Sequence, residues 1–174
     1  PSGFGTPLSM TMNAVNKVQH LYSTSNSSEV LVLGIGNDPE VHEYPAIYNA
    51  LLSYIPHRFV HRRYSNVLPK LPAIVLHHQP VKPQPMHNYY DQLSTTKSYI
   101  RLRPGEGTIT VSHILPFVSK PNAYHQFAPP RTLANGVSIL GYSTHTTENR
   151  LEWEIHWITG ERTDANYHFF NHLY

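Results

Sequence analysis

The strongest constraint on the fold is the strict alternation of side-chain type in residues 151–157, Leu-Glu-Trp-Glu-Ile-His-Trp. Successive side chains of a β-strand point to opposite faces, so the apolar residues of this run share one face and the Glu and His residues share the other. A second apolar run at 137–145 precedes it. Together the two runs predict an antiparallel pair with one buried face, the later strand covering 150–159.

Strand-like runs separated by Pro, Gly and Asn fill most of the remaining chain. Residues 14–25 and 28–36 read as strands, and we expect the first strand of the fold within 14–36. Further strands are expected at 57–65, 71–79, 97–103, 108–118 and 123–128. The sequence therefore predicts an all-β fold, an eight-stranded antiparallel jelly-roll sandwich with one or two short helices in its loops.

Two segments carry the expected helical turns. In residues 43–55 the apolar residues Ile47, Ala50, Leu51 and Tyr54 recur with the period of a helix. Residues 86–94 can form one or two further turns. No internal repeat is visible.

Length and composition favour one domain with a neutral polar surface. The 174 residues suit a single jelly-roll domain over 1–174, with residues 1–13 as an extended arm and 160–174 as a C-terminal tail. Charged residues make up only 14% of the chain and the formal net charge is +2, a composition that suits surfaces buried against other proteins. No apolar run approaches the roughly 20 residues needed to cross a bilayer, so we expect no membrane association.

No catalytic or metal-binding constellation is visible. The chain has no cysteine, and its 13 histidines include no His-x-His pair of the kind that jelly-roll metal sites use. Residues 34–36, Gly-Ile-Gly, are followed by Asn-Asp-Pro and by no immediate helix start, so no phosphate-binding loop is predicted. We therefore expect a protein without enzymatic activity, metal or cofactor.

A concentration of positive charge stands out in residues 56–66, Pro-His-Arg-Phe-Val-His-Arg-Arg-Tyr-Ser-Asn. As a strand, it would place Arg58, Arg62 and Tyr64 on one face, where cations and an aromatic ring could bind a nucleic acid strand. With basic residues of other predicted strands, the candidate nucleic-acid contacts are Arg58, Arg62, Arg63, Tyr64, Arg101, Arg103 and Lys17. Two alternatives stay open: charges that protect an edge strand, and arginines paired with acidic residues.

Three segments, in their order, resemble the single jelly-roll capsid proteins of small icosahedral viruses, above all circovirus-like capsids of single-stranded DNA viruses and their small RNA-virus relatives. They are "PAIYNALLSYIPHRFVHRRYSN" (45–66), "MHNYYDQLSTTKSYIRLRPGEGTITVSHILPFVSKP" (86–121) and "VSILGYSTHTTENRLEWEIHWITGER" (137–162). The resemblance extends over about residues 44–160. The arginine-rich N-terminal arm common in that family has no counterpart in this sequence.

The resemblance implies a capsid subunit of a T=1-type shell. Many copies would assemble into a small icosahedral virion around a single-stranded viral genome, within the nucleus or cytoplasm of a host cell, and the particle could bind a host receptor. The alternative is a jelly-roll lectin or adhesin, in which Tyr89, Tyr90 and Tyr124 would stack on sugars. A jelly-roll metalloenzyme is the third reading. Particle formation, glycan binding and metal retention distinguish the three.

Overall fold

The computed structural model of this protein describes residues 8–34, 36–62, 67–79, 90, 93–101, 108–116, 125–148 and 150–159. Within them the chain is mostly β and forms one sheet of five strands and one of three. It divides into two compact units, residues 1–118 (unit 1) and residues 119–174 (unit 2), where the sequence led us to expect one domain.

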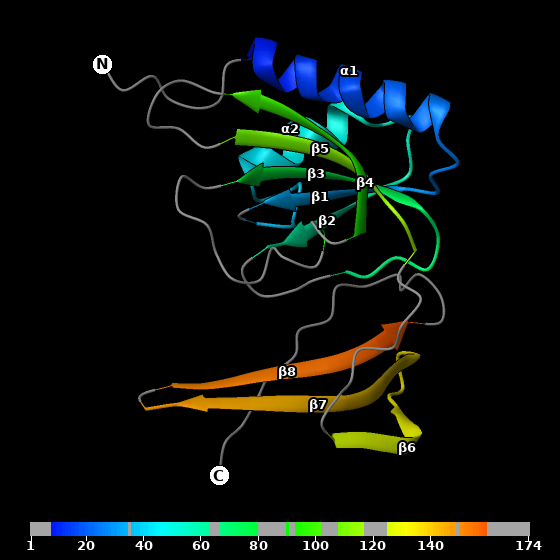
Figure 1. Cartoon of the computed structure of the whole chain (residues 1–174), viewed down its shortest axis with the longest axis vertical. Coiled ribbons are helices and arrows are strands. Elements are labelled where there is room, and N and C mark those ends of the chain that lie inside the picture. Colours follow the sequence, from blue (N-terminus) through cyan, green and yellow to red (C-terminus); the bar gives the residue numbers. More distant parts are fainter. Residues whose placement is uncertain are drawn as a thin grey trace. The chain divides into compact units, whose positions relative to one another are not determined.

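The sheet of unit 1 has the strand order β2-β1-β3-β5-β4 (Figure 1). β1 (Val30–Gly34) lies between β2 (His57–His61) and β3 (Ala73–Gln79) and runs parallel to both. β5 (Thr108–Ile114) is antiparallel to β3 and to the edge strand β4 (Ser94–Arg101). Consequently β4 runs in the same direction as β1, β2 and β3, and β5 alone is reversed.

This mixed sheet differs from the predicted antiparallel sandwich. Helix α2 (Glu43–Leu51) connects β1 to β2, and parallel neighbours need such a crossover because both strands must start at the same edge. All five residues of β1, Val-Leu-Val-Leu-Gly, are buried, as expected for a parallel strand that is covered on both faces. The predominance of strands is confirmed, whereas the jelly-roll arrangement is not.

The strand predicted at 14–25 is wrong, because these residues belong to helix α1 (Leu8–Thr24). Its buried residues, Thr11, Ala14, Val15 and Val18, follow the spacing i, i+3, i+4 and i+7, which is the period of a helix. The valines favour strands by propensity, but packing of this stripe on the sheet decides the outcome. Residues 8–13 also lie in α1 and form no extended arm, while residues 1–7 lie outside the described residues.

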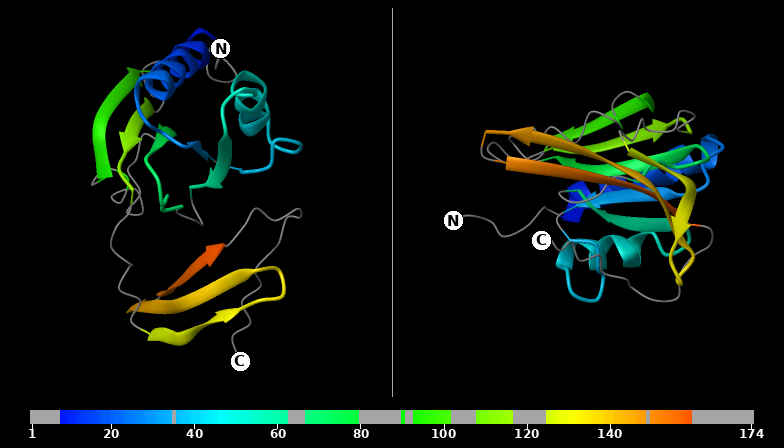
Figure 2. Two further views of the ribbon diagram at one scale, coloured as in Figure 1. Left: turned by 90° about the vertical axis from the view of Figure 1, so that its right-hand side faces the viewer. Right: turned by 90° about the horizontal axis from the view of Figure 1, so that it is seen from below.

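Helix α2 confirms the helix predicted at 43–55, but a different face is buried. Tyr48 and Leu52 belong to the core, whereas Tyr54, one of the residues in the predicted helical pattern, is 96% exposed. Figures 1 and 2 show both helices on the same face of the sheet. There α1 and α2 share one core with Val30 and Val32 of β1. The opposite face of the sheet has its own core, which includes Leu31 and Leu33.

Unit 2 is an antiparallel meander of β6 (His125–Thr132), β7 (Val137–Thr147) and β8 (Arg150–Thr159). The strands predicted at 137–145 and 150–159 are confirmed, and the one predicted at 123–128 is observed from residue 125. In unit 1 the predicted strands 57–65, 71–79, 97–103 and 108–118 correspond to β2, β3, β4 and β5 with shifted ends. Of the segment 86–94, only residues 90, 93 and 94 lie within the described part.

Candidate functional site

The carboxyl ends of three parallel strands meet at one edge of the unit 1 sheet. From β1 the chain passes through α2 to β2 on one side, whereas from β3 it continues to β4 on the other side. Connections that leave two neighbouring parallel strands in opposite directions open a crevice between their carboxyl ends, which is where open α/β sheets bind ligands. In unit 1 this point lies between β1 and β3.

Five residues gather at this point, and we call them the carboxyl-edge site: Gly34, His42, Tyr44, Arg62 and His78. The Tyr44 ring, from the first turn of α2, packs on Gly34 so closely that a Cβ there would lie 3.0 Å from it. The Tyr44 and His78 rings have centroids 5.5 Å apart and are tilted by 33°. Gly34 therefore lets an aromatic pair close over the end of β1.

The turn after β1 also depends on glycine. Gly36 has φ +99°, and a Cβ at this position would lie 2.5 Å from the His42 ring. His42 precedes α2 as its N-cap residue, and its Nδ1 lies 3.2 Å from the carbonyl oxygen of Asp38. No helix starts directly after Gly-Ile-Gly, as predicted, and α2 begins seven residues after Gly36, at Glu43.

Arg62 ties the three strand ends together. Its backbone N–H donates to the carbonyl oxygen of Gly34 at 3.0 Å, and its guanidinium donates to the carbonyl oxygen of His78. This residue follows β2 directly and does not continue the strand as predicted. Burial raises the pKa of Tyr44, and the positive charge of Arg62 offsets a small part of that rise.

Two phenol groups beneath the site are buried. The hydroxyls of Tyr44 and Tyr48 make no hydrogen bond of ordinary geometry with the described residues. They do interact with each other, and that of Tyr48 also interacts with Thr11, while the two rings contact edge to face with centroids 4.7 Å apart. Burial is the main cause that raises the pKa of each phenol, well above its usual value in Tyr44. Both therefore remain protonated at neutral pH and can donate a hydrogen bond to a ligand or water.

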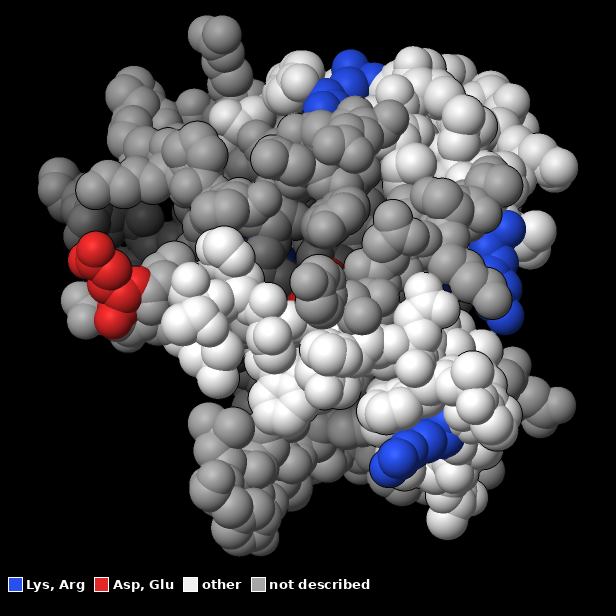
Figure 3. Space-filling view, turned by 60° about the horizontal axis from the view of Figure 1, so that its bottom comes forward, with Lys and Arg blue, Asp and Glu red and all other residues white. Residues whose placement is uncertain are grey.

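Of the basic residues predicted to bind nucleic acid, the structure describes the side chains of Arg58, Arg62 and Lys17. Arg58, on β2, binds the Glu29 carboxylate through two hydrogen bonds of 2.7 and 2.5 Å, which supports the ion-pair alternative. Arg101 lies on β4 at the opposite edge of the sheet, roughly 19 Å away at about 4.8 Å per strand. On the face shown in Figure 3, Lys and Arg side chains form separate spots. Arg63, Tyr64, Arg103 and the side chain of Arg101 lie outside the described residues.

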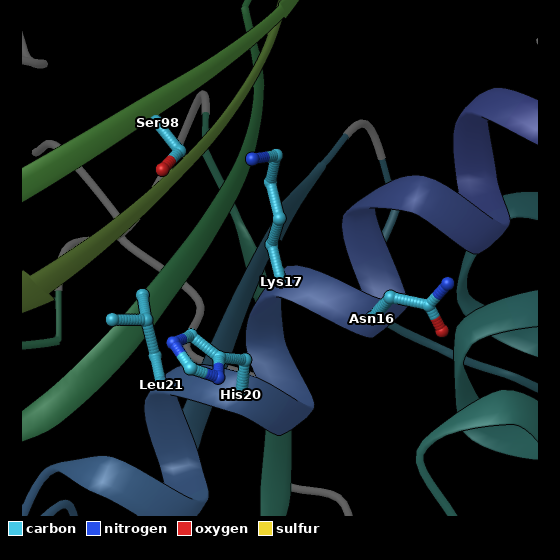
Figure 4. Close-up of a pocket in the computed structure, with 5 residues that line it drawn as sticks. All are labelled: Asn16, Lys17, His20, Leu21 and Ser98. Carbon is cyan, nitrogen blue, oxygen red and sulfur yellow. The ribbon is translucent and has the colours of Figure 1, made fainter.

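Lys17 lies on helix α1, although a strand was predicted there. It lines a shallow pocket of about 240 Å³ between α1 and β4, together with Asn16, His20, Leu21 and Ser98. Figure 4 shows the Lys17 side chain extending toward the strand that carries Ser98. No ion pair of Lys17 occurs among the described residues. Lys17 is thus partly open to solvent and lies on a helix, whereas Arg58 lies on strand β2.

Unit 2 presents a second candidate surface, which we call the aromatic face: His125, Phe127, Tyr142, Trp153 and Trp157. The Tyr142 ring stacks on His125 at 4.7 Å and contacts Trp153 edge to face at 5.7 Å, measured between centroids. Trp153 and Trp157 are each 43% exposed. The predicted alternation of β8 is therefore present, but the face predicted to be buried remains open to solvent in the described residues.

Comparisons with protein-family models, curated proteins and solved structures found no match for this chain. Within the described residues, no three His, Cys, Asp or Glu side chains are grouped to hold a metal ion. The two helices of the described part are not long and apolar enough to cross a membrane.

Proposed function

We propose that unit 1 binds a nucleoside-containing small molecule at the carboxyl-edge site. The observation that carries this proposal is the connectivity of the adjacent parallel strands β1 and β3. After β1 the chain goes to one side of the sheet, and after β3 it goes to the other side. In sheets of this kind the crevice at the diverging ends is the usual ligand site. The described residues there supply rings, a cation and buried hydroxyl donors within one small region.

The chemistry of these residues favours a nucleoside over a highly charged phosphate ligand. Tyr44 and His78 offer ring surfaces on which a base can stack. Arg62 and the N-terminus of α2 favour a negative group. Two carboxylates lie beside them, however: Asp38 in the turn before α2 and Glu43 in the first turn of α2. A carboxylate can accept hydrogen bonds from ribose hydroxyls, whereas it would repel a triphosphate.

Isothermal titration of the full chain with adenosine, AMP, ATP, NAD and S-adenosylmethionine tests the proposal. At least one of these probes should bind with a dissociation constant below about 1 mM. The Tyr44→Phe variant removes one buried hydroxyl and should weaken that binding about fivefold to tenfold, as expected for one hydrogen bond. The matched variant Tyr54→Phe changes a side chain that is 96% exposed and should bind like the original protein. Absence of binding for the whole panel contradicts the proposal.

A capsid subunit with a jelly-roll arrangement is the second candidate. It is supported by the sequence resemblance and by large apolar side chains of unit 1 that are open to solvent, Val41 at 74%, Tyr54 at 96% and Leu71 at 60%, because such side chains are commonly buried between subunits. The parallel pairs of β1 speak against it. Negative-stain electron microscopy, with the absorbance ratio at 260 and 280 nm, provides the test. Uniform nucleic-acid-containing particles would support the capsid function, and a monomer with a protein-like ratio would contradict it.

A further inference from the structure

The aromatic face of unit 2 spans all three strands of the sheet. His125 and Phe127 come from β6, Tyr142 from β7, and Trp153 and Trp157 from β8. The Phe127 and Tyr142 centroids are 6.1 Å apart, so the rings form a continuous row with the contact of Tyr142 to Trp153. Trp157 lies four residues from Trp153 on the same face, roughly 13 Å along the strand. The result is a surface of mutually tilted aromatic rings that includes two separate indole rings.

Charge on this face is positive. The Arg131 guanidinium lies 4.6 Å from the centroid of the Phe127 ring. Glu154 lies opposite Ser143 in the strand register, and both point to the other face of the sheet, where the Ser143 hydroxyl lies 3.4 Å from Nε2 of His156. No Asp or Glu occurs among the residues of β6 to β8 that share the face of Trp153. The face thus combines aromatic rings with a cation and lacks acceptor carboxylates.

We propose that the aromatic face binds single-stranded nucleic acid by stacking of bases on its rings. Exposed aromatic side chains with neighbouring cations form the usual platform for unpaired bases, because every base has a flat ring surface and every nucleotide a phosphate. A duplex hides its bases from such a platform. A sugar-binding site would need carboxylate or amide acceptors beside the rings, and the described part of this face carries no carboxylate.

The proposal assigns distinct roles to the ring and the cation. Trp153 stacks on a base, so its loss should weaken binding at any salt concentration. Arg131 contacts phosphate, so its loss should reduce the steepness with which affinity falls as salt rises. If a second copy of the chain covered this face instead, oligonucleotides would not bind there, and neither variant would change an oligonucleotide affinity.

Fluorescence anisotropy of the full chain with fluorescein-labelled dT12 and U12, at 50 and 200 mM salt, tests these roles. Both probes should bind, and a labelled 12-base-pair duplex should bind at least tenfold more weakly. Trp153→Leu should weaken binding about 5- to 150-fold, and Arg131→Gln should flatten the salt dependence. Ile158→Ala, on the opposite face and 41% exposed, is the matched control and should bind like the original protein.

Far-UV circular dichroism and melting temperature of each variant show whether folding is retained. Tyr44→Phe should leave oligonucleotide binding unchanged, which separates this surface from the nucleoside site proposed in unit 1. Failure of dT12 and U12 to bind, or equal binding by folded Trp153→Leu, overturns the proposal. Sedimentation of the original protein as a dimer, with Trp153→Leu monomeric and neither binding oligonucleotide, would overturn it in favour of a second copy as the occupant.

Discussion

The two units are built largely from strands, yet they differ in where their apolar side chains lie. Every buried apolar side chain of the described residues except Val137 belongs to unit 1. In unit 1, continuous apolar runs such as β1 and residues 73–76 are covered on both faces. In unit 2, β8 alternates over residues 151–157, and its Leu, Trp and Ile side chains in that range line one face that stays partly open. The local pattern thus separates a strand that forms a core from a strand that offers a surface.

The largest expected effect comes from truncating one leucine in each unit. Leu31→Ala removes a fully buried side chain and should lower the free energy of unfolding by about 2–5 kcal/mol. Leu151→Ala changes a side chain that is 49% exposed and should cost less than about 1 kcal/mol. Both tryptophans lie in unit 2 and both described helices in unit 1. In denaturant titrations, tryptophan fluorescence therefore reports unit 2, and circular dichroism at 222 nm reports mainly unit 1.

The comparison predicts that Leu31→Ala shifts the circular dichroism midpoint much more than the fluorescence midpoint. Equal shifts of both midpoints would mean that the two units unfold together, and the distinction between a core-forming unit and a surface-bearing unit would then not extend to stability.

A matched pair of glycines gives the next effect. Gly36→Ala places a Cβ 2.5 Å from the His42 ring at φ +99°, whereas at Gly136, with φ +79°, a Cβ meets nothing within 4 Å. Gly136→Ala should therefore cost only the backbone conformation, about 1–2 kcal/mol. Gly36→Ala should cost that amount plus the clash, and should also weaken any nucleoside binding. Thermal unfolding of the two variants measures the difference, and an equal loss in both would show that His42 moves aside freely.

The sequence predicted β8 because the period of two over residues 151–157 has no other regular explanation. It did not predict the parallel pairing of β1, because strand direction depends on contacts between distant residues and leaves no local pattern. Helix α1 was missed because the valines suggested a strand, although Ala14, Val15 and Val18 carry the helical period. For the carboxyl-edge site, the sequence feature that could have indicated a ligand-binding turn was the pair Gly34 and Gly36 after an apolar strand. The contact of Tyr44 with His78 required the fold.

A smaller effect concerns Tyr90, which joins a loop to the core of unit 1. Its hydroxyl accepts from the Val67 N–H at 2.9 Å and donates to the Val67 carbonyl oxygen at 3.1 Å. Burial raises the pKa of Tyr90 to about 12, against a weaker lowering by the Val67 N–H. The unfolded phenol ionises near pH 10, so this contribution to stability is complete below about pH 10 and is lost as pH rises through the folded pKa.

Tyr90→Phe should cost about 1 kcal/mol at pH 7 and should reduce the loss of unit 1 stability between about pH 10 and 11.5. Urea titrations followed at 222 nm across this range measure both effects. Tyr54→Phe, at a position that is 96% exposed, serves as the control. An unchanged alkaline slope in Tyr90→Phe would show that this phenol does not couple folding to pH.

The smallest expected effect on stability concerns one arginine in each unit. The Arg58 side chain is 51% exposed in its ion pair with Glu29, and exposed pairs contribute about 0–1 kcal/mol, so Arg58→Gln should hardly change the unfolding midpoint. Because Glu29 already neutralises this charge, Arg58→Gln should also leave dT12 affinity within about twofold at 50 mM salt, whereas Arg131→Gln should lower it severalfold. If Arg58→Gln lowered dT12 affinity more than Arg131→Gln, nucleic acid would bind at the basic strand of unit 1, as the sequence pattern predicted. The aromatic face of unit 2 would then be a surface for a protein partner.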